Sequence, residues 1–143
     1  MAYDIEDTAE FTAGNHDNVH RLHVVTQKRR YNLIVDILGH PRGLPSLSEL
    51  DYMNPPVERT TIQDHLQRLI EVDVVETVVI PVGERSRDLP HVFYGLTESG
   101  RQLLDSHGLL DEAEAWQDLY ARVEKPEKIR TYEDAPRPER TEI

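Results

Sequence analysis

Apolar residues recur at helical spacing in the first third of the chain. Between Gln27 and His40 they fall at positions i, i+3, i+4 and i+7, the spacing of one buried helical face: Tyr31, Ile34, Val35 and Leu38. Thr26 is a plausible N-cap, and the glycines and proline of residues 39–43 end the pattern. We therefore predict a first helix over residues 27–40. Residues 1–22 lack this period and indicate an acidic mobile arm or, at most, a short helix.

Two shorter helical patterns follow, separated by a tight turn. Ser46 and Glu49 have the spacing of a capping box, which opens a helix with Leu47, Leu50 and Met53 as its apolar members. Asn54-Pro55-Pro56 ends that helix, because proline cannot donate a backbone hydrogen bond. A third helix is predicted from about Val57 to Val72, with an inward stripe of Ile62, Leu66, Leu69 and Ile70. Its outward face is polar and carries Arg59, Thr60, Gln63, Asp64, Gln67 and Arg68. The three segments predict a helix-turn-helix.

β-Branched residues replace the helical pattern after this point. Residues 74–82 and 91–96 read as two strands, joined by a polar loop that carries Arg85 and Arg87. A strand, a basic loop and a second strand after a helix-turn-helix have the outline of a wing. Thr97 then caps a fourth helix, which ends at His107-Gly108.

A last apolar stripe runs through residues 109–123, with spacings of 4, 3, 4 and 3: Leu109, Ala113, Trp116, Tyr120 and Val123. It could pack as core in its own domain, but a helix after a wing has little intrachain surface left to cover. We therefore predict that these residues form a homodimer seam. The charged, proline-containing residues 125–143 predict an extended or disordered tail that packs locally on its own or a partner subunit. The expected organisation is an arm (1–22), a domain (23–108), a dimerisation helix (109–124) and a tail (125–143).

The composition narrows the class of protein. A chain of 143 residues holds one compact domain with arms, and the absence of cysteine excludes disulfides and thiolate metal sites. No apolar stretch approaches the roughly 20 residues of a membrane span, and the acidic N-terminus lacks signal-peptide features, so we expect a cytoplasmic protein. The 27 acidic and 16 basic residues, with only three lysines, are typical of a salt-adapted, halophilic protein. Residues 21–104 are nearly neutral, with 11 acids and 10 bases, so an anionic partner is best tolerated there.

Two runs of residues resemble a known group of proteins. Arg59-Thr60-Thr61-Ile62-Gln63-Asp64-His65-Leu66-Gln67-Arg68-Leu69, followed by Val74-Val75, resembles the recognition-helix segment of winged-helix regulators of the ArsR and MarR type. Tyr94-Gly95-Leu96-Thr97-Glu98-Ser99-Gly100 resembles the end of the wing in PadR-like and ArsR-like proteins. With its acidic, lysine-poor composition, the chain looks like a haloarchaeal winged-helix regulator over residues 24–123.

This resemblance implies a fold and a partner. The fold is mainly α with a small β-hairpin, a winged helix-turn-helix with an added C-terminal dimerisation helix. The function is sequence-specific binding of double-stranded DNA by a homodimer that regulates transcription, with the recognition helix in the major groove and the wing on flanking DNA. Asp73 stands where such proteins often have glycine, and Glu58, Asp64 and Glu71 place negative charge beside the proposed DNA face. The alternative is therefore an interaction module that binds a protein and no DNA.

The residue types suit these contacts. Arginine pairs with guanine and glutamine with adenine in the major groove, and threonines at a helix N-terminus suit phosphates. The alternative for each of these groups of polar residues is an ordinary solvated surface with no DNA contact. The predicted DNA contacts are Arg59, Thr60, Thr61, Gln63, Asp64, Gln67 and Arg68 in the third helix, Arg85 and Arg87 in the wing, and Lys28 and Arg30 of the run Lys28-Arg29-Arg30 at the start of the first helix. At high salt, bound cations could bridge Asp64 to phosphate.

The sequence offers no outline of a catalytic site. Of its seven histidines, His65 lies beside the apolar stripe and is predicted to be a half-buried packing residue rather than a metal ligand. Gly-rich phosphate loops, nucleophile elbows and paired carboxylates in an apolar setting are not found. We therefore expect no enzyme activity, no cofactor and no metal site.

Overall fold

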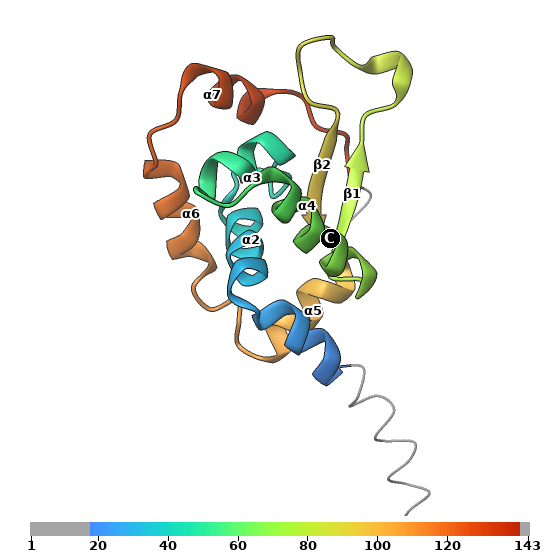
Figure 1. Cartoon of the computed structure of the whole chain (residues 1–143), viewed down its shortest axis with the longest axis vertical. Coiled ribbons are helices and arrows are strands. Elements are labelled where there is room, and N and C mark those ends of the chain that lie inside the picture. Colours follow the sequence, from blue (N-terminus) through green and yellow to red (C-terminus); the bar gives the residue numbers. More distant parts are fainter. Residues whose placement is uncertain (1–17, 141–143) are drawn as a thin grey trace, which may run out of the picture.

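The computed structural model describes residues 18–140, and its elements form a mainly helical body with one β-hairpin (Figure 1). Residues 18–26 are helical. They are followed by α2 (Lys28–Gly39), α3 (Leu47–Met53), α4 (Arg59–Glu71), β1 (Val75–Val79), the 3-10 turn η1 (Val82–Glu84), β2 (Val92–Leu96), α5 (Glu98–Ser106), α6 (Ala113–Arg122) and α7 (Glu127–Asp134). From α2 to α5 the helices and strands follow the predicted order, but the strand predicted over residues 74–82 ends at Val79, and η1 was not predicted.

The chain is already helical before α2, and this corrects two predictions. Most of the predicted arm, residues 1–17, lies outside the described residues, but residues 18–22 continue into a helix whose Val24 and Val25 are buried. Thr26 belongs to that helix, because its hydroxyl donates to the Leu22 carbonyl at 2.7 Å. The N-cap of α2 is Gln27 instead, whose side chain accepts a hydrogen bond from the next turn.

Helix α2 lies at the centre of the body and is buried on more than one side. The predicted core residues Ile34 and Leu38 are buried, whereas Tyr31 and Val35 are only half-buried. Leu33 and Ile37 are buried as well, so the stripe is wider than predicted. The reason is that α2 contacts α3 and α4 as well as α6, and a helix packed on several sides needs apolar residues around most of its surface.

The helix-turn-helix begins with the predicted capping box. The Ser46 hydroxyl accepts from the Glu49 backbone, and the Glu49 carboxylate accepts from the Ser46 backbone at 2.8 Å. At the other end of α3, the Asn54 amide donates to Asp36 on α2 and to the Leu50 carbonyl, both at 2.7 Å. Burial raises the pKa of Asp36 to about 7, against the opposing effect of the Asn54 hydrogen bond. The turn between α3 and α4 is thus tied to α2.

The hairpin joins the body through both of its ends. β1 and β2 pair antiparallel with Val75 opposite Leu96 and Val79 opposite Val92. Asp73, before β1, has a φ of 58°, so an aspartate does occupy the left-handed conformation expected of glycine there. The last glycine of the Gly-Leu-Thr-Glu-Ser-Gly run, Gly100, is required by packing, because a Cβ at this position would lie 2.4 Å from the Val74 carbonyl oxygen.

The packing of helix α6 contradicts the argument that led to the predicted dimer seam. It begins at Ala113 rather than Leu109, and its apolar stripe packs against α2 of the same chain. The Trp116 ring meets Tyr31 edge-on at a centroid distance of 6.1 Å, and Tyr120 is only 4% exposed. Gly39 permits this approach, since a Cβ there would lie 2.9 Å from the Trp116 carbonyl oxygen.

The five seam residues therefore have little free surface. Leu109, Ala113 and Trp116 are half-buried, Tyr120 is buried, and only Val123 is exposed. The premise that little intrachain surface remained for this stripe was wrong, because α2 presents a second face. A homodimer stays a prediction, and it needs a contact surface other than the side of α6 that packs against α2.

The C-terminal segment is more ordered than predicted as far as residue 140. Residues 127–134 form α7, which packs against α3, and the chain then crosses to the hairpin. There Arg140 pairs with Glu76 and donates to the Leu96 carbonyl at 2.7 Å. The segment packs locally on its own chain, as expected. It consists of α7 and an extended stretch, residues 135–140, which we call the strap, rather than a disordered tail.

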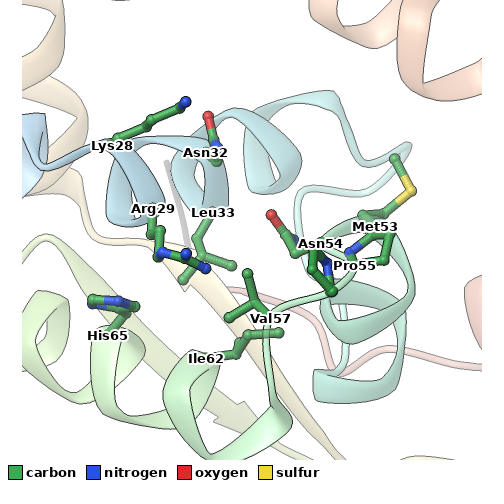
Figure 2. A pocket seen from close by; sticks show the side chains of 11 residues that line it. Lys28, Arg29, Asn32, Leu33, Met53, Asn54, Pro55, Val57, Ile62 and His65 are labelled. Carbon is green, nitrogen blue, oxygen red and sulfur yellow. The ribbon is translucent and has the colours of Figure 1, made fainter.

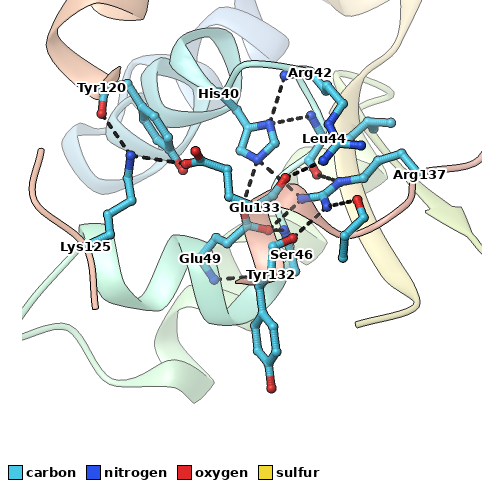
Figure 3. A network of polar contacts seen from close by, with 11 residues as sticks. His40, Arg42, Leu44, Ser46, Glu49, Tyr120, Lys125, Tyr132, Glu133 and Arg137 are labelled. Carbon is cyan, nitrogen blue, oxygen red and sulfur yellow. Dashed lines mark hydrogen bonds and ion pairs between the residues drawn. The ribbon is translucent and has the colours of Figure 1, made fainter. Parts of the chain in front are cut away.

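A buried polar network holds this strap (Figure 3). The Arg137 guanidinium, 4% exposed, pairs with the fully buried Glu49 carboxylate at 2.8 Å and lies 4.2 Å from the centre of the Phe93 ring. Glu49 also contacts His40 Nε2 at 2.8 Å. Burial would raise the pKa of Glu49, but the hydrogen bonds and charges of His40 and Arg137, together with the Ser46 hydrogen bond, hold it below its usual value. The capping box of α3 is therefore completed by a residue 88 positions later in the chain.

Candidate nucleic-acid interface

Helix α4 presents one continuous polar face to solvent. Its core stripe of Ile62, Leu66 and Leu69 is at most 1% exposed. The six residues predicted on the opposite face are all exposed: Arg59, Thr60, Gln63, Asp64, Gln67 and Arg68. Gln63 and Gln67 are one helical turn apart, so their amides lie on neighbouring parts of the same face. The structure thus brings together the residue types that read base edges.

The charge on α4 is balanced. Arg59 and Arg68 are offset by Asp64 and Glu71, all of them exposed. Arg59 contacts Asp51 on α3 at 3.4 Å, but its side chain is 50% exposed. An exposed pair of this kind contributes roughly 0–1 kcal/mol, so a DNA base or phosphate can compete for the guanidinium. Hydrogen-bond matching, rather than net charge, is what this face offers a partner.

The first turn of α4 has polar groups suited to an anion. Glu58 occupies the N-cap position but makes no side-chain capping bond, so no side chain covers the backbone N–H groups there. Thr60 is exposed and Thr61 is half-buried beside them. The phosphate contacts of the two threonines stay a prediction.

The basic residues at the start of α2 do not all face outward. Lys28 and Arg29 are exposed, whereas Arg30 is half-buried. The Arg30 Nε donates to the Val24 carbonyl, and its Nη1 lies 3.3 Å from His65 Nδ1. Burial and the charge of Arg68 lower the pKa of Arg30. Its guanidinium serves the contact between α2 and α4, and within the run Lys28-Arg29-Arg30 it is Arg29 that lies exposed beside Lys28.

The predicted wing is a projecting loop. Residues 80–91 join the two strands and extend away from the helices in Figure 1. Arg87 is exposed, and Arg85 is exposed while its Nε donates to the Ile80 carbonyl at 2.9 Å. Val82 in η1 is 77% exposed. The structure therefore places two arginines on the loop, on a projection separate from the α4 face.

His65 is half-buried, as predicted, and its ring serves packing between α2 and α4. Within residues 18–140, no group of three or more histidines, aspartates and glutamates is arranged to hold a metal ion. The same residues contain no helix with the length and hydropathy that a membrane crossing requires.

Comparison with known proteins gives one informative likeness. Neither a protein-family model nor a curated protein matches the sequence. Among solved structures, the chain is similar to a protein with a GntR superfamily winged-helix-turn-helix domain from Halomicrobium mukohataei, with a TM-score of 0.79 and 28% identity over 88% of this chain and 90% of that one. The likeness supports the winged-helix interpretation but not the ArsR, MarR or PadR type in particular. The chain has a winged helix-turn-helix fold.

Proposed function

We propose that the protein is a sequence-specific DNA-binding regulator of transcription, located in the cytoplasm. The observation that carries this proposal is the α4 face, where six polar residues are exposed opposite a fully buried apolar stripe. In a winged helix-turn-helix, a helix in this position enters the major groove. The GntR superfamily domain of the structural neighbour supports the same use of the fold.

Each group of residues has a role in this proposal. Gln63, Gln67 and Arg68 read base edges from the middle of α4. The first-turn residues Arg59, Thr60 and Thr61 contact phosphates and nearby bases, which sets the register of the helix on DNA. On the flanks, Arg85 and Arg87 clamp the backbone from the wing, and Lys28 supplies a further phosphate contact. Arg30 is withdrawn from this list because its side chain is engaged within the fold.

The acidic composition fits DNA binding at high salt. Counterion release, which dominates most DNA binding at low salt, contributes little in multimolar salt. Affinity then rests on base contacts, on ordered water and on cations that bridge exposed carboxylates such as Asp64 to phosphate. The chain resembles a protein from a haloarchaeon, which supports a salt-rich working environment.

We also propose that the regulator works as a homodimer on a pseudo-palindromic site, with half-sites about 34 Å or a multiple apart. The contact surface is the outward side of α6, where Leu119 is 60% and Val123 is 39% exposed. Leu119→Glu should then give a folded monomer. Light scattering in multimolar potassium chloride measures this, and a parent protein that is monomeric at micromolar concentration contradicts the dimer.

One observation favours a second candidate, a winged-helix module that binds a protein. Glu58, Asp64 and Glu71 are exposed on or beside α4 and would repel phosphate where no cation intervenes. A mobility-shift assay with genomic fragments at high potassium distinguishes the two functions. The DNA-binding proposal predicts retarded fragments and a loss of affinity for all sequences alike in the Arg85→Ala, Arg87→Ala double variant. An absence of any retarded fragment favours the protein-binding module.

A further inference from the structure

A hollow of about 310 Å³ lies between the first turns of α2, the α3–α4 turn and the middle of α4 (Figure 2). Its apolar lining consists of the half-buried Met53 and Val57 and the exposed Pro55 and Pro56, together with Leu33 and Ile62, which are at most 2% exposed. The rim is polar and includes the side chains of Lys28, Arg29, Asn32, Asn54 and His65. A volume near 300 Å³ is at the lower end of the range for small-molecule sites, so an occupant must be small.

The charge of this hollow differs from that of the chain. Its eleven lining residues include two basic side chains and a histidine but no aspartate or glutamate, although acids outnumber bases 27 to 16 in the whole chain. Burial, followed by the charges of Arg30, Arg29 and Arg68, holds the pKa of His65 below its usual value despite the nearby Asp64. The hollow is therefore a place where an anion is favoured.

We propose that the hollow binds a small organic anion that carries a compact apolar part. The exposed ammonium of Lys28 and guanidinium of Arg29 pair with the anionic group, and Met53, Val57 and the two prolines of the α3–α4 turn contact the apolar part. The exposed amide of Asn32 offers an additional hydrogen bond to the anionic group. A DNA phosphate would use the rim alone, because it has no apolar part and cannot enter a hollow enclosed by three elements. The combination of cationic rim and apolar lining thus favours a small molecule.

The position of the hollow implies that such a ligand changes DNA affinity, an inference that rests on the proposed function. Its wall contains the turn that sets the position of α4 relative to α3, and Asn54 in that turn is bonded to Asp36 on α2. An occupant that touches both α2 and α4 prefers one arrangement of the two helices. If DNA prefers a different arrangement, the ligand lowers DNA affinity and DNA lowers ligand affinity by the same factor.

The experiment uses the full chain and 1-naphthoate as the probe, with the neutral 1-naphthamide as its matched compound. Methyl NMR follows Leu33, Val57 and Ile62 in potassium chloride at the lowest concentration that keeps the chain folded. We expect saturable shifts of these methyl groups with naphthoate and at least tenfold weaker binding of the amide. The Lys28→Gln, Arg29→Gln double variant should also bind naphthoate at least tenfold more weakly.

Two further variants separate the site from general effects. Arg101→Gln with Arg122→Gln removes two exposed positive charges outside the hollow and should leave naphthoate binding unchanged. Asn32→Trp keeps the charges but fills the mouth, and it should abolish the methyl shifts while the fold remains intact.

The outcomes are distinct for the site and for the proposed function. Equal binding of naphthoate and naphthamide, shifts elsewhere in the chain, or no shifts at all would overturn the site. Shifts of these methyl groups caused by a DNA duplex but not by naphthoate would limit Lys28 and Arg29 to the phosphate contact of the proposed function and also overturn the site. Naphthoate binding in a chain that retards no DNA would leave the site standing and remove only its link to DNA.

Discussion

Replacing Asp36 by asparagine should stabilise the protein at high pH and leave it unchanged at low pH. Asp36 lies between α2 and the α3–α4 turn, where burial raises its pKa from 3.8 to about 7. The raised value means that the folded state binds the proton more tightly than the unfolded chain does. The carboxyl therefore stabilises the fold below pH 4, and this contribution is lost as the pH rises towards 7.

The size of the effect follows from the same values. A pKa difference between 3.8 and about 7 corresponds to roughly 4 kcal/mol, since each tenfold change in the proton affinity is worth about 1.4 kcal/mol. The residual exposure of Asp36 makes this an upper bound, so we expect a gain of about 2–4 kcal/mol for Asp36→Asn at pH 8. The new amide oxygen can still accept the hydrogen bond that Asn54 donates at 2.7 Å.

Urea unfolding of the parent and the variant from pH 4 to pH 8, at constant salt, measures this difference. Asp118→Asn on the exposed side of α6 is the control for the loss of one negative charge, and its effect should be small at every pH. A difference between parent and Asp36→Asn that does not grow with pH, or that has the opposite sign, would refute the reasoning.

The remaining predictions concern packing. Gly100→Ala should destabilise the fold by more than 2 kcal/mol, because the added methyl group would lie 2.4 Å from a carbonyl oxygen, whereas Gly83→Ala meets nothing within 4 Å and should be nearly neutral in thermal unfolding. Arg137→Ala leaves the carboxylate of Glu49 buried without its charged partner and should cost about 3–5 kcal/mol in urea unfolding, with partial recovery by Arg137→Lys. Trp116→Ala should lower the melting temperature by the same amount at every protein concentration, since the ring packs within one chain, and a concentration-dependent loss would point to a dimer contact instead.

The local patterns were sufficient for most of the fold. The Ser46 and Glu49 capping box, the apolar stripe of α4 and the Thr97 cap depend on residues within a few positions of one another, so each could be predicted from spacing. The exposed face of α4 follows from the same stripe. The left-handed conformation of Asp73 was also foreseeable, because a turn between helix and strand requires it.

The errors concern contacts between distant parts of the chain. The stripe of α6 shows that a face will be buried, but it does not say whether the partner is α2 or a second subunit. The charged residues after Lys125 carry too few apolar positions to form a stripe, because the segment buries Ile129 and Ala135 singly and is also held by Arg137 through a buried ion pair with Glu49. Arg30 was assigned to DNA because an arginine beside a helix start looks free until its hydrogen bond to the Val24 carbonyl is known.

The central claim is that α4 reads DNA, and selection from randomised duplexes at high potassium tests it most directly. Gln63→Ala and Gln67→Ala remove one amide each without touching the core stripe, and Gln102→Ala on the exposed side of α5 is the matched control. Circular dichroism confirms that each variant is folded. We predict that the parent and the control enrich the same inverted repeat, while each α4 variant loses discrimination of about 1–3 kcal/mol at one position per half-site. Enrichment of the same sites with the same affinity by the parent and both α4 variants would contradict the account.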